Sequence, residues 1–460
     1  VLPTTELAYA LQEAHRRGWR FHGAHPVLDY FVGEANLPPS VLSRPLYKQS
    51  AGLNVVALRR LARMSTWTPW WRLPAAVANP EAVAITHNDL LVSAARTWRK
   101  RVAFRHAELI LAEARQHFGA RNHHAPLEDL ARHLVDALSP GEDLEEELAG
   151  RWRRMLESEI HCVLSQASSD LHSLRQVQRL PVTVWAGSGG YWPARAIGLE
   201  TRRRGGAMTC FDHGHNRALH DVHEWPLLVD LAVSARLVVA THRTASHLAH
   251  RMTRTPTLMG QGGVVEGFSR APDLSSVDDS GPGKTRGSRP RVLYAPGILR
   301  GFRQTVPAAL PDQIYLDWQI RLMETISSFP VDVLCRPHPE GIMTGQRHPL
   351  ADIVRVEGRS FEDLMPLADV YLFDEPNSRV FCMALVTRRP VVYVDIGAPY
   401  FAPEIKALID KRCTVIKSTP DDRGRPWVDF RHVEQAICQP CCPDPTALAE
   451  LRQLLIGVDG

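Results

Sequence analysis

Short apolar runs alternate with amphipathic segments in the carboxyl-terminal half of the chain. Four apolar runs have the length and β-branched content of buried strands: 291–296, 331–334, 370–373 and 391–394. Helical periodicity marks the segments between them and a closing segment: 316–328, 360–367, 378–386 and 445–456. Strands that alternate with helices predict a parallel sheet with crossover helices.

A second α/β layer is predicted to begin at residue 180. Three more apolar runs read as strands: 181–186, 207–211 and 237–240. A glycine-rich turn that includes Ser188 and Gly189 follows the first run, and a helix is predicted over 191–201. Backbone amides in such a turn can bind an anion, so both residues are candidate contacts for a donor or an acceptor. A plain structural turn is the alternative, since the turn lacks a fuller fingerprint.

The remaining amino-terminal part is predicted to be mainly helical. Residues 94–120 and 127–168 carry apolar and charged positions at helical spacing. Trp67, Trp70 and Trp71 form an aromatic cluster that reads as an anchor in a core or interface, or as a platform that stacks against an acceptor.

These segments give a domain organisation. Residues 269–290 are rich in Ser, Asp, Gly and Pro and are predicted to be a flexible linker. The full division is a mainly helical acceptor-side region, a Rossmann-like acceptor domain, the linker, a Rossmann-like nucleotide-donor domain and a closing helix: 1–179, 180–268, 269–290, 291–443 and 444–460.

Chain length, charge balance and the distribution of apolar residues exclude some classes of function. A chain of 460 residues is long enough for two or three domains. Its 54 basic and 50 acidic side chains are too balanced to indicate a nucleic-acid partner. The sequence has no apolar run of membrane-spanning length and no visible secretory signal, with a trimmed signal as the alternative.

The eight cysteines favour a reducing compartment, and we expect a cytoplasmic protein. Several of them lie in apolar runs, where a thiol behaves as a small hydrophobic group. Cys438, Cys441 and Cys442 have the spacing of half a zinc site, but no second ligand pair lies near them in the sequence. No metal is predicted there.

The most informative segment is Arg336-Pro337-His338-Pro339, which follows the strand at 331–334. Ligands of open parallel sheets bind outside the carboxyl ends of strands. An imidazole and a guanidinium at that position suit a phosphate. A surface histidine in a proline turn is the alternative, because the same dipeptide recurs at His25 and His348.

Two further strand ends carry candidate residues. Pro296 and Gly297 follow one strand, and Asp374, Glu375, Asn377 and Ser378 follow another. Ser378 falls where a helix begins, so it is either a phosphate ligand or only an N-cap. We expect His338 to lie one strand over from Ser378, forming a phosphate clamp.

The acidic residues near these strand ends are candidate contacts for a donor or an acceptor. We expect Asp374 and Glu375 to face the same crevice, and Glu340 is a further candidate. A structural salt bridge from Arg336 to Asp374 or Glu375 is an equal alternative to phosphate binding by Arg336.

In the order of these motifs, the chain resembles the donor domain of GT-B transferases of bacterial surface glycans. It is similar to the CDP-glycerol glycerophosphotransferase group and to the CMP-using sialic acid and Kdo transferases that share the His-Pro motif. The resemblance covers about 290–420 well and 180–260 more loosely. It implies two Rossmann-like domains that face each other across a cleft, with His338 and Ser378 on the phosphates of a cytidine nucleotide.

The resemblance also implies a catalytic base at a strand end of the acceptor domain. Asp212-His213-Gly214 matches the motif in part, so the base is His213 or Asp212, and His215 is a further candidate contact. Asn377-Ser378 replaces the usual serine pair, and His215-Asn216 follows the glycine. These departures put the donor sugar in question.

The predicted function is transfer of a sugar from a cytidine-nucleotide donor, of the CMP-nonulosonate or CMP-Kdo type, to a hydroxyl of a bacterial surface glycan or glycoprotein. No metal or other cofactor is predicted, and the CMP- or CDP-linked donor is a substrate. Peripheral contact with the inner face of the cytoplasmic membrane is predicted through the basic segment 96–101, with a solvated helix start as the alternative.

Other functions stay open at this point. They are a CDP-glycerol or CDP-polyol phosphotransferase of the same fold, a nucleotide-sugar epimerase, and a binding protein built on an inactive transferase. A metallohydrolase is a further alternative, with its ligands drawn from a cluster of six residues: Asp212, His213, His215, His220, Asp221 and His223.

Overall fold

The computed structural model describes most of the chain from residue 60 onward. The described residues are 60–118, 127–138, 146–219, 230–252, 263–271, 274, 289–299, 310–341, 343, 345–397 and 401–457. They fall into two compact units. One unit holds both large β-sheets and lies within Met64–Phe104, Val182–Trp192 and Gly205–Gly460; the other holds helices within Arg105–Pro181 and Pro193–Arg204.

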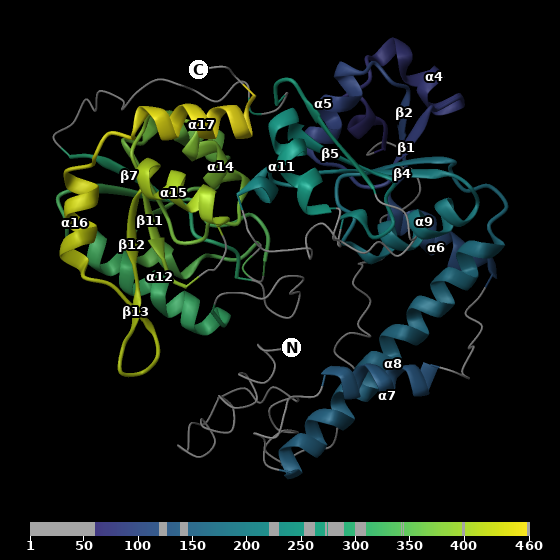
Figure 1. The fold of residues 1–460 in the computed structure, drawn as a ribbon, viewed down its shortest axis with the longest axis horizontal. Coiled ribbons are helices and arrows are strands. Elements are labelled where there is room, and N and C mark those ends of the chain that lie inside the picture. The colour runs from purple at the N-terminus through teal and green to yellow at the C-terminus, as the bar shows by residue number, and fades with distance from the viewer. Residues whose placement is uncertain are drawn as a thin grey trace. The chain divides into compact units, whose positions relative to one another are not determined.

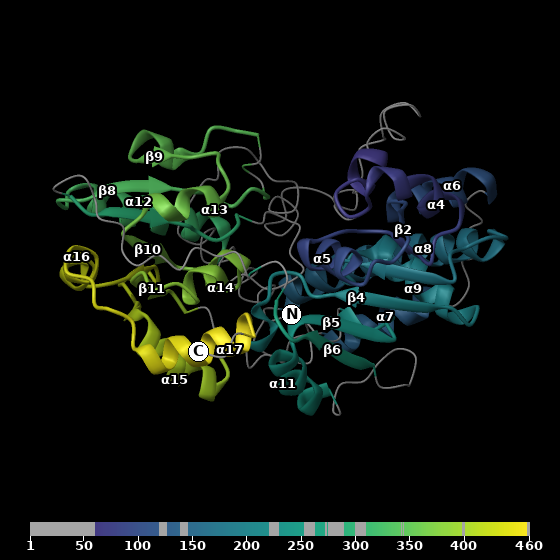
Figure 2. The ribbon, with the colours of Figure 1, turned by 90° about the horizontal axis from the view of Figure 1, so that it is seen from above.

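The first sheet has six parallel strands in the order β2-β1-β3-β4-β5-β6. Their bounds are β1 Ala82–Ala84, β2 Val102–Phe104, β3 Thr183–Ala186, β4 Ala207–Phe211, β5 Arg236–Thr241 and β6 Val264–Phe268. Figure 2 shows β4, β5 and β6 side by side. The strands predicted near 181–186, 207–211 and 237–240 are confirmed.

Two strands of this sheet lie in the region predicted to be mainly helical, so that prediction is wrong for residues 82–84 and 102–104. Instead of one helix over 94–120, the chain forms α5 (Asp89–Thr97), β2 and α6 (Ala107–Phe118). All three side chains of β2 are buried. Strands of three residues are too short to show an alternating pattern, which is why the periodicity of the flanking helices hid them.

The second sheet also has six parallel strands, in the order β12-β11-β10-β7-β8-β9. Their bounds are β7 Arg291–Tyr294, β8 Asp332–Cys335, β9 Arg355–Val356, β10 Val370–Phe373, β11 Val391–Asp395 and β12 Thr414–Lys417. The accompanying helices are α12 Asp312–Ser327, α13 Phe361–Leu364, α14 Arg379–Leu385, α15 Pro403–Arg412, α16 Phe430–Cys438 and α17 Pro445–Leu455. The predicted class, an α/β chain with two Rossmann-like parallel sheets and accompanying helices, is confirmed.

Alternate side chains of the second sheet enter two separate cores, as successive residues of a strand point to opposite faces. Tyr371 and Phe373 pack with residues of α14 and α17, whereas Val370 and Leu372 pack with residues of α12 and α16. Figure 1 shows α17 and α12 on opposite sides of these strands. Because both faces of the central strands β10 and β11 are buried, these strands read as continuous apolar runs, and this made them easy to predict.

The carboxyl-terminal helix joins the two sheets of this unit. The hydroxyls of Thr241 and Thr244, at the start of α11 (His242–Met252), donate to the Leu454 carbonyl at 2.6 and 2.8 Å. The Ala271 amide donates to the Ile456 carbonyl at 2.7 Å. Ala271 belongs to the predicted linker and is fully buried; most of that linker lies outside the described residues.

The helical unit contains α6, α7 (Leu127–Leu138), α8 (Glu146–Gln176) and most of α9 (Trp192–Arg203). These confirm the helices predicted near 127–168 and 191–201. Arg115 on α6 makes a two-bond contact with the buried Asp170 on α8, at 2.7 and 2.8 Å. This paired geometry is the strong form of the arginine–carboxylate interaction.

A buried guanidinium fixes the carboxyl end of α14. Arg412 is 2% exposed and donates only to carbonyl oxygens in the part of the chain that the structure describes. Its four acceptors are the carbonyls of Ala384, Leu385, Thr387 and Arg389. A cation at this end also complements the helix dipole, although burial lowers the Arg412 pKa.

Replacing Arg412 by Met should lower the free energy of unfolding by roughly 3 kcal/mol, because four buried carbonyls each lose a donor; the Ala384 carbonyl keeps the Thr387 hydroxyl, at 2.8 Å. Urea denaturation checks this. Arg431→Met, at a side chain 88% exposed and paired with Asp429 at 3.0 Å, is the control and should leave stability nearly unchanged. Equal effects of the two substitutions would contradict the role given to Arg412.

Candidate functional site

Three segments with candidate residues meet at one edge of the second sheet. They follow β7, β8 and β10, and parallel strands place their carboxyl ends at the same edge. The expectation that His338 lies one strand over from Ser378 is wrong, because β7 lies between β8 and β10. Adjacent strands are about 4.8 Å apart, so the two residues flank the segment at Pro296 and Gly297.

Close backbone packing joins these three segments in order. A Cβ at Gly297 would lie 2.7 Å from the Glu375 Cβ, and a Cβ at Gly341 would lie 2.4 Å from the Leu299 carbonyl oxygen. Both distances are shorter than real contacts allow, so each site needs glycine. Gly341 also has a φ of +110°. Phosphate binding by Pro296 or Gly297 stays a prediction; the Gly297 amide itself donates to the Tyr315 hydroxyl at 2.5 Å.

The prediction that Asp374 faces a crevice is wrong. Its carboxylate is fully buried and accepts hydrogen bonds from the Tyr294 hydroxyl at 2.6 Å, the Tyr315 hydroxyl at 2.7 Å and the Trp318 indole at 3.0 Å. Burial raises the pKa of Asp374, and the three donors oppose that shift. Asp374 therefore ties β7 and β10 to α12 and positions the neighbouring Glu375–Ser378 segment.

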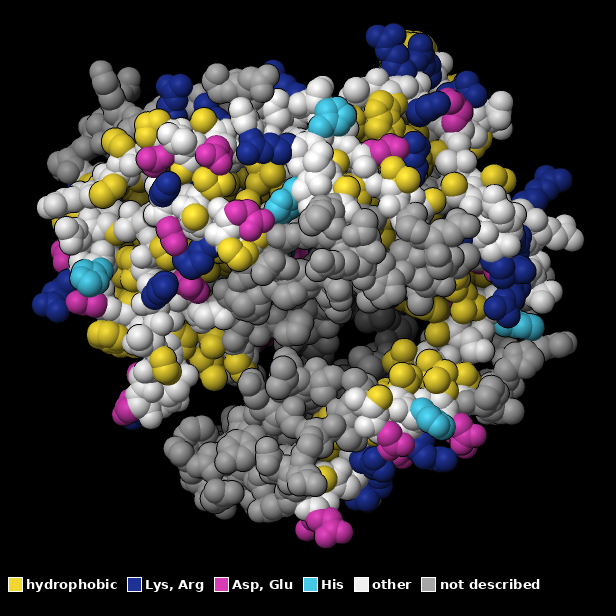
Figure 3. Space-filling model, viewed as in Figure 1, with side chains coloured by type: hydrophobic (Ala, Val, Ile, Leu, Met, Phe, Trp, Pro, Cys, Tyr) yellow, Lys and Arg dark blue, Asp and Glu magenta, His cyan; other side chains and the backbone are white. Residues whose placement is uncertain are grey.

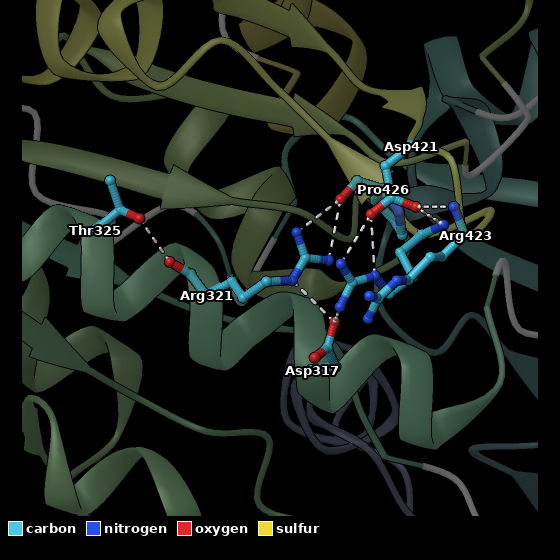
Figure 4. Close-up of polar contacts among 7 residues, drawn as sticks. Asp317, Arg321, Thr325, Asp421, Arg423 and Pro426 are labelled. Carbon is cyan, nitrogen blue, oxygen red and sulfur yellow. Dashed lines mark hydrogen bonds and ion pairs between the residues drawn. The ribbon is translucent and has the colours of Figure 1, made fainter. Parts of the chain in front are cut away.

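Helix α12, which supplies two of these donors, has an anchor of its own (Figure 4). The Arg321 guanidinium donates to the Pro426 carbonyl through both terminal nitrogens at 3.1 Å and to Asp317 at 2.9 Å. Pro426 begins β14 (Pro426–Trp427), which pairs with β13 (Thr419–Pro420). The small hairpin thus holds the helix that fixes Asp374.

Arg336 does not form the salt bridge that was the alternative to phosphate binding. Within the described residues its guanidinium donates to the carbonyls of Arg359, at 2.5 Å, and Pro337. The half-buried His338 accepts the Glu340 amide at Nδ1, at 3.2 Å. A neutral ring that accepts at Nδ1 carries its hydrogen on Nε2, where it can donate to a phosphate. The Glu340 side chain is exposed, and its contact role stays a prediction.

The His338 turn has a close match in the chain. His348, in the second His-Pro dipeptide, accepts the Leu350 amide at Nδ1, at 3.3 Å. The hydrogen bond is therefore a local property of His-Pro turns. What distinguishes His338 is its place at the carboxyl edge of the sheet, since His348 precedes a short 3-10 helix.

Ser378 is an N-cap, as the structural alternative predicted. Its hydroxyl oxygen accepts the Phe381 amide at 3.2 Å at the start of α14. The hydroxyl hydrogen can still be donated, because an N-cap uses only the oxygen. Glu375 accepts the Asn377 amide at 2.9 Å, so its carboxylate turns back onto its own segment. Ligand contacts of Ser378, Asn377 and Glu375 stay predictions.

The candidate base segment follows β4. His213 is exposed, whereas Asp212 and His215 are 1% and 2% exposed. Neither carboxylate oxygen of Asp212 has a hydrogen-bond partner within the described ranges, and the Arg217 Nε lies 3.3 Å from Oδ1. Burial raises the Asp212 pKa, and Arg217 opposes the shift. An acceptor can reach His213 but not the oxygens of Asp212.

Arg217 forms ion pairs with two buried carboxylates. Besides Asp212, it pairs with Asp230, which is 2% exposed and accepts the Gly189 amide at 3.2 Å. The predicted anion-binding role of Gly189 is therefore corrected: its amide donates to a carboxylate of the chain itself. Ser188 is half-buried, and its contact role stays a prediction.

Asn88, which was not among the residues predicted from the sequence, joins the ends of two strands. Its amide nitrogen donates to the carbonyls of Gly187, Phe211 and Asp212 at 2.9, 3.0 and 2.9 Å. Its oxygen accepts the Leu91 amide at 2.8 Å as the N-cap of α5. Asn followed by Asp before an apolar periodic run is an N-cap signal, so the cap was detectable from the sequence.

The two strand-end regions of this unit touch. The Asn216 side-chain amide donates to the Asn377 side-chain oxygen. A Cβ at Gly214 would lie 3.8 Å from the Arg379 amide nitrogen, an ordinary contact distance. Arg379 also pairs with Asp89 at the start of α5, at 2.6 Å. The segment with the candidate base therefore abuts the segment with Ser378.

Over the described ranges, no group of three or more His, Cys, Asp or Glu side chains is placed to hold a metal ion. His220, Asp221 and His223 of the alternative metal cluster lie outside these ranges. All eight cysteines are free thiols, with Cys441 and Cys442 exposed.

No protein-family model matches the sequence, and a comparison with curated proteins finds no match. Several solved structures align over most of the chain. The calicheamicin glycosyltransferase CalG4 is 13% identical, covering 82% of this chain and 93% of that one, with a TM-score of 0.38. UDP-bound Os79 from O. sativa is 10% identical, with 82% and 94% coverage and a TM-score of 0.40.

The wall teichoic acid polymerase TagF is 9% identical, covering 77% of this chain and 80% of that one, with a TM-score of 0.28. At these TM-scores the similarities do not establish a shared activity. The fold class rests on the two parallel sheets, and function rests on the residues at their edges.

Tyr315→Phe should lower the free energy of unfolding by about 1–2 kcal/mol, because the buried Asp374 loses one donor and the Gly297 amide loses its acceptor. Hydrogen exchange should also accelerate at residues 297–299. Urea denaturation with exchange mass spectrometry checks both effects. Unchanged exchange at these residues would contradict the positioning role of the Asp374 network.

The Arg217 cluster predicts opposite effects for its two acids. Asp212→Asn should raise the free energy of unfolding at pH 7 by about 1 kcal/mol, since it removes a buried charge and leaves one acid for Arg217. Asp230→Asn should lower it, because Arg217 and the Gly189 amide lose their close acceptor.

The Asp212 effect has a defined pH dependence. A folded-state pKa raised above the unfolded value means that protonated Asp212 favours folding, and this contribution is lost as pH rises through the folded pKa. The wild type and Asp212→Asn should therefore be equally stable in acid and diverge toward pH 7. Urea unfolding across this pH range checks the sign, and a gap that widens in acid would contradict it.

Proposed function

We propose that the chain is a GT-B-type glycosyltransferase that moves a sugar from a cytidine-nucleotide donor to a hydroxyl of a bacterial surface glycan or glycoprotein. The proposed donor is a CMP-activated nonulosonate or Kdo. The observation that carries this proposal is the hydrogen bond between Asn216 and Asn377, which joins the two candidate segments. This contact supports the proposal that a proton acceptor from one sheet and phosphate donors from the other act on one substrate.

His213 is the proposed base, because its ring is exposed beside the Asn216 contact, whereas Asp212 is buried. The acceptor hydroxyl attacks the anomeric carbon while its proton passes to the imidazole. Such general-base assistance contributes about 10²–10⁴ in rate.

The leaving group is CMP, which departs with the electron pair of the broken bond between the sugar carbon and the phosphate oxygen. His338, Ser378 and the remaining guanidinium donors of Arg336 are proposed to bind the phosphate. They lie at one edge of the second sheet, with β7 between them. Fixed donors at the position where charge develops are the largest source of stabilisation in such reactions. No metal or cofactor takes part in the proposed step.

The proposed setting is the cytoplasm, with peripheral contact at the inner face of the membrane. In the described part of the chain, no helix has the length and apolar character needed to cross a membrane. No nucleic acid takes part in the proposal.

His338→Ala should weaken CMP binding at least tenfold, because a phosphate loses a donor. His348→Ala is the matched control: it removes a histidine from the same kind of turn and should leave CMP affinity unchanged once folding is verified. His213→Ala should keep CMP affinity and lower the rate of CMP release from a donor by about 10²–10⁴.

Isothermal titration with CMP, CDP, UMP and UDP, followed by a panel of activated donors, checks these outcomes. No preference for cytidine nucleotides would contradict the donor assignment. CMP release from CDP-glycerol, but not from CMP-sugars, would indicate the phosphotransferase alternative. Donor turnover without any acceptor would indicate an epimerase.

A further inference from the structure

The Trp67–Trp71 cluster separates into one anchor and two exposed rings. Trp67 is 4% exposed, and its indole donates to the Val102 carbonyl at 3.0 Å. Trp70 and Trp71, in the 3-10 helix η1 (Trp70–Arg72), are 76% and 64% exposed. Among the described residues, Val182 is the one other large hydrophobic side chain exposed to this extent. The prediction that this cluster is a core anchor is therefore confirmed for Trp67 and not for Trp70 or Trp71.

The exposed rings continue into a wider apolar surface. Helix α4 (Leu73–Ala78) follows η1 directly, and Pro74 and Val77 are exposed on it. We call Trp70, Trp71, Pro74 and Val77 the tryptophan surface. Exposed apolar side chains that cluster in this way often mark a site of interaction.

The chemistry of this segment limits what the partner can be. Over residues 69–78 the sequence is Pro-Trp-Trp-Arg-Leu-Pro-Ala-Ala-Val-Ala, so Arg72 is its only polar side chain. A glycan site combines a stacking ring with hydroxyl-binding carboxylates or amides, and this segment supplies neither. A tryptophan pair with an arginine instead suits the boundary between lipid headgroups and acyl chains.

Basic side chains are fixed at both ends of the tryptophan surface. Arg96 Nε donates to the Thr66 carbonyl at 2.7 Å, just before Trp67. Arg101 Nε donates to the Asn79 carbonyl at 3.0 Å, where α4 ends. Figure 3 shows dark blue Lys and Arg side chains beside yellow hydrophobic ones where Figure 1 places α4 and β2.

The net charge of this region is positive. Residues 64–104 contain five basic side chains and two acidic ones, a net charge of +3. The acid Glu81 pairs with Lys100 at 3.1 Å, and Asp89 pairs with Arg379 at 2.6 Å. An apolar centre with a basic rim is complementary to an anionic lipid surface.

We propose that Trp70 and Trp71 insert into the interface of a membrane that contains anionic lipids, and that Arg72, Arg96 and Arg101 bind its phosphates. The predicted basic segment 96–101 is thereby the rim of the contact, with the tryptophans at its centre. This docking surface uses none of the residues proposed for sugar transfer.

Sedimentation with sucrose-loaded vesicles tests the proposal. The full chain should bind vesicles of phosphatidylglycerol and phosphatidylcholine, and bind pure phosphatidylcholine at least tenfold less. The double variant Trp70→Ser, Trp71→Ser should lose at least tenfold in partitioning. Arg72→Gln should lose about fivefold and reduce the salt dependence. Trp427→Ser, at a ring 48% exposed on β14, is the matched control and should bind like the wild type.

Several outcomes would overturn this docking surface. They are no preference for anionic vesicles, equal losses for Trp427→Ser and the double variant, or self-association of the wild type that the double variant abolishes without any vesicle binding. CMP titration of the double variant separates this proposal from the proposed function. A double variant that keeps its CMP affinity and loses vesicle binding would support membrane docking. If the wild-type chain binds vesicles but not CMP, the docking proposal still holds and the cytidine assignment is wrong.

Discussion

The buried carboxylate of Asp374 is the interaction on which the candidate site depends. Three donors from β7 and α12 converge on it, and the Gly297 amide contacts one of them. An unpaired charge at this depth would be strongly destabilising, so the donors and the acid must be placed together. Because Asp374 directly follows β10, the same network positions the Asn377–Ser378 segment. Asp374 is therefore a buried positioning residue for the candidate site.

Two further side-chain contacts position the corresponding strand ends of the first sheet. Asn88 holds the ends of β3 and β4, and Asn216 reaches Asn377 from the segment after β4. Each uses the side-chain amide of an asparagine. These uncharged contacts bring the exposed His213 and the phosphate-binding candidates into one unit. Buried charge remains at Asp212, Arg217 and Asp230, where it sets the electrostatics beside the proposed base.

The sequence predicted the four inner strands of the second sheet, β7, β8, β10 and β11, because strands buried on both faces read as continuous apolar runs. It did not predict the edge strands β9 and β12, nor β6 of the first sheet. It also located the strand ends that carry His338 and Ser378. The sequence did not predict β1 and β2, because each strand has only three residues and shows no alternating pattern. The predicted position of β8 was wrong by one strand, because the order of strands in a sheet does not follow their order in the chain. Asp374 was assigned to a crevice, since nothing in the sequence shows that Tyr294, Tyr315 and Trp318 converge on it.

The central claim is that His338 and Ser378 share one nucleotide phosphate opposite His213. A crystal structure of the protein with CMP tests this most directly. The account predicts density for the phosphate within hydrogen-bond distance of His338 Nε2 and the Ser378 hydroxyl, with the His213 ring facing the open side of the phosphate. A nucleotide bound elsewhere, or a phosphate held without either side chain, would contradict it.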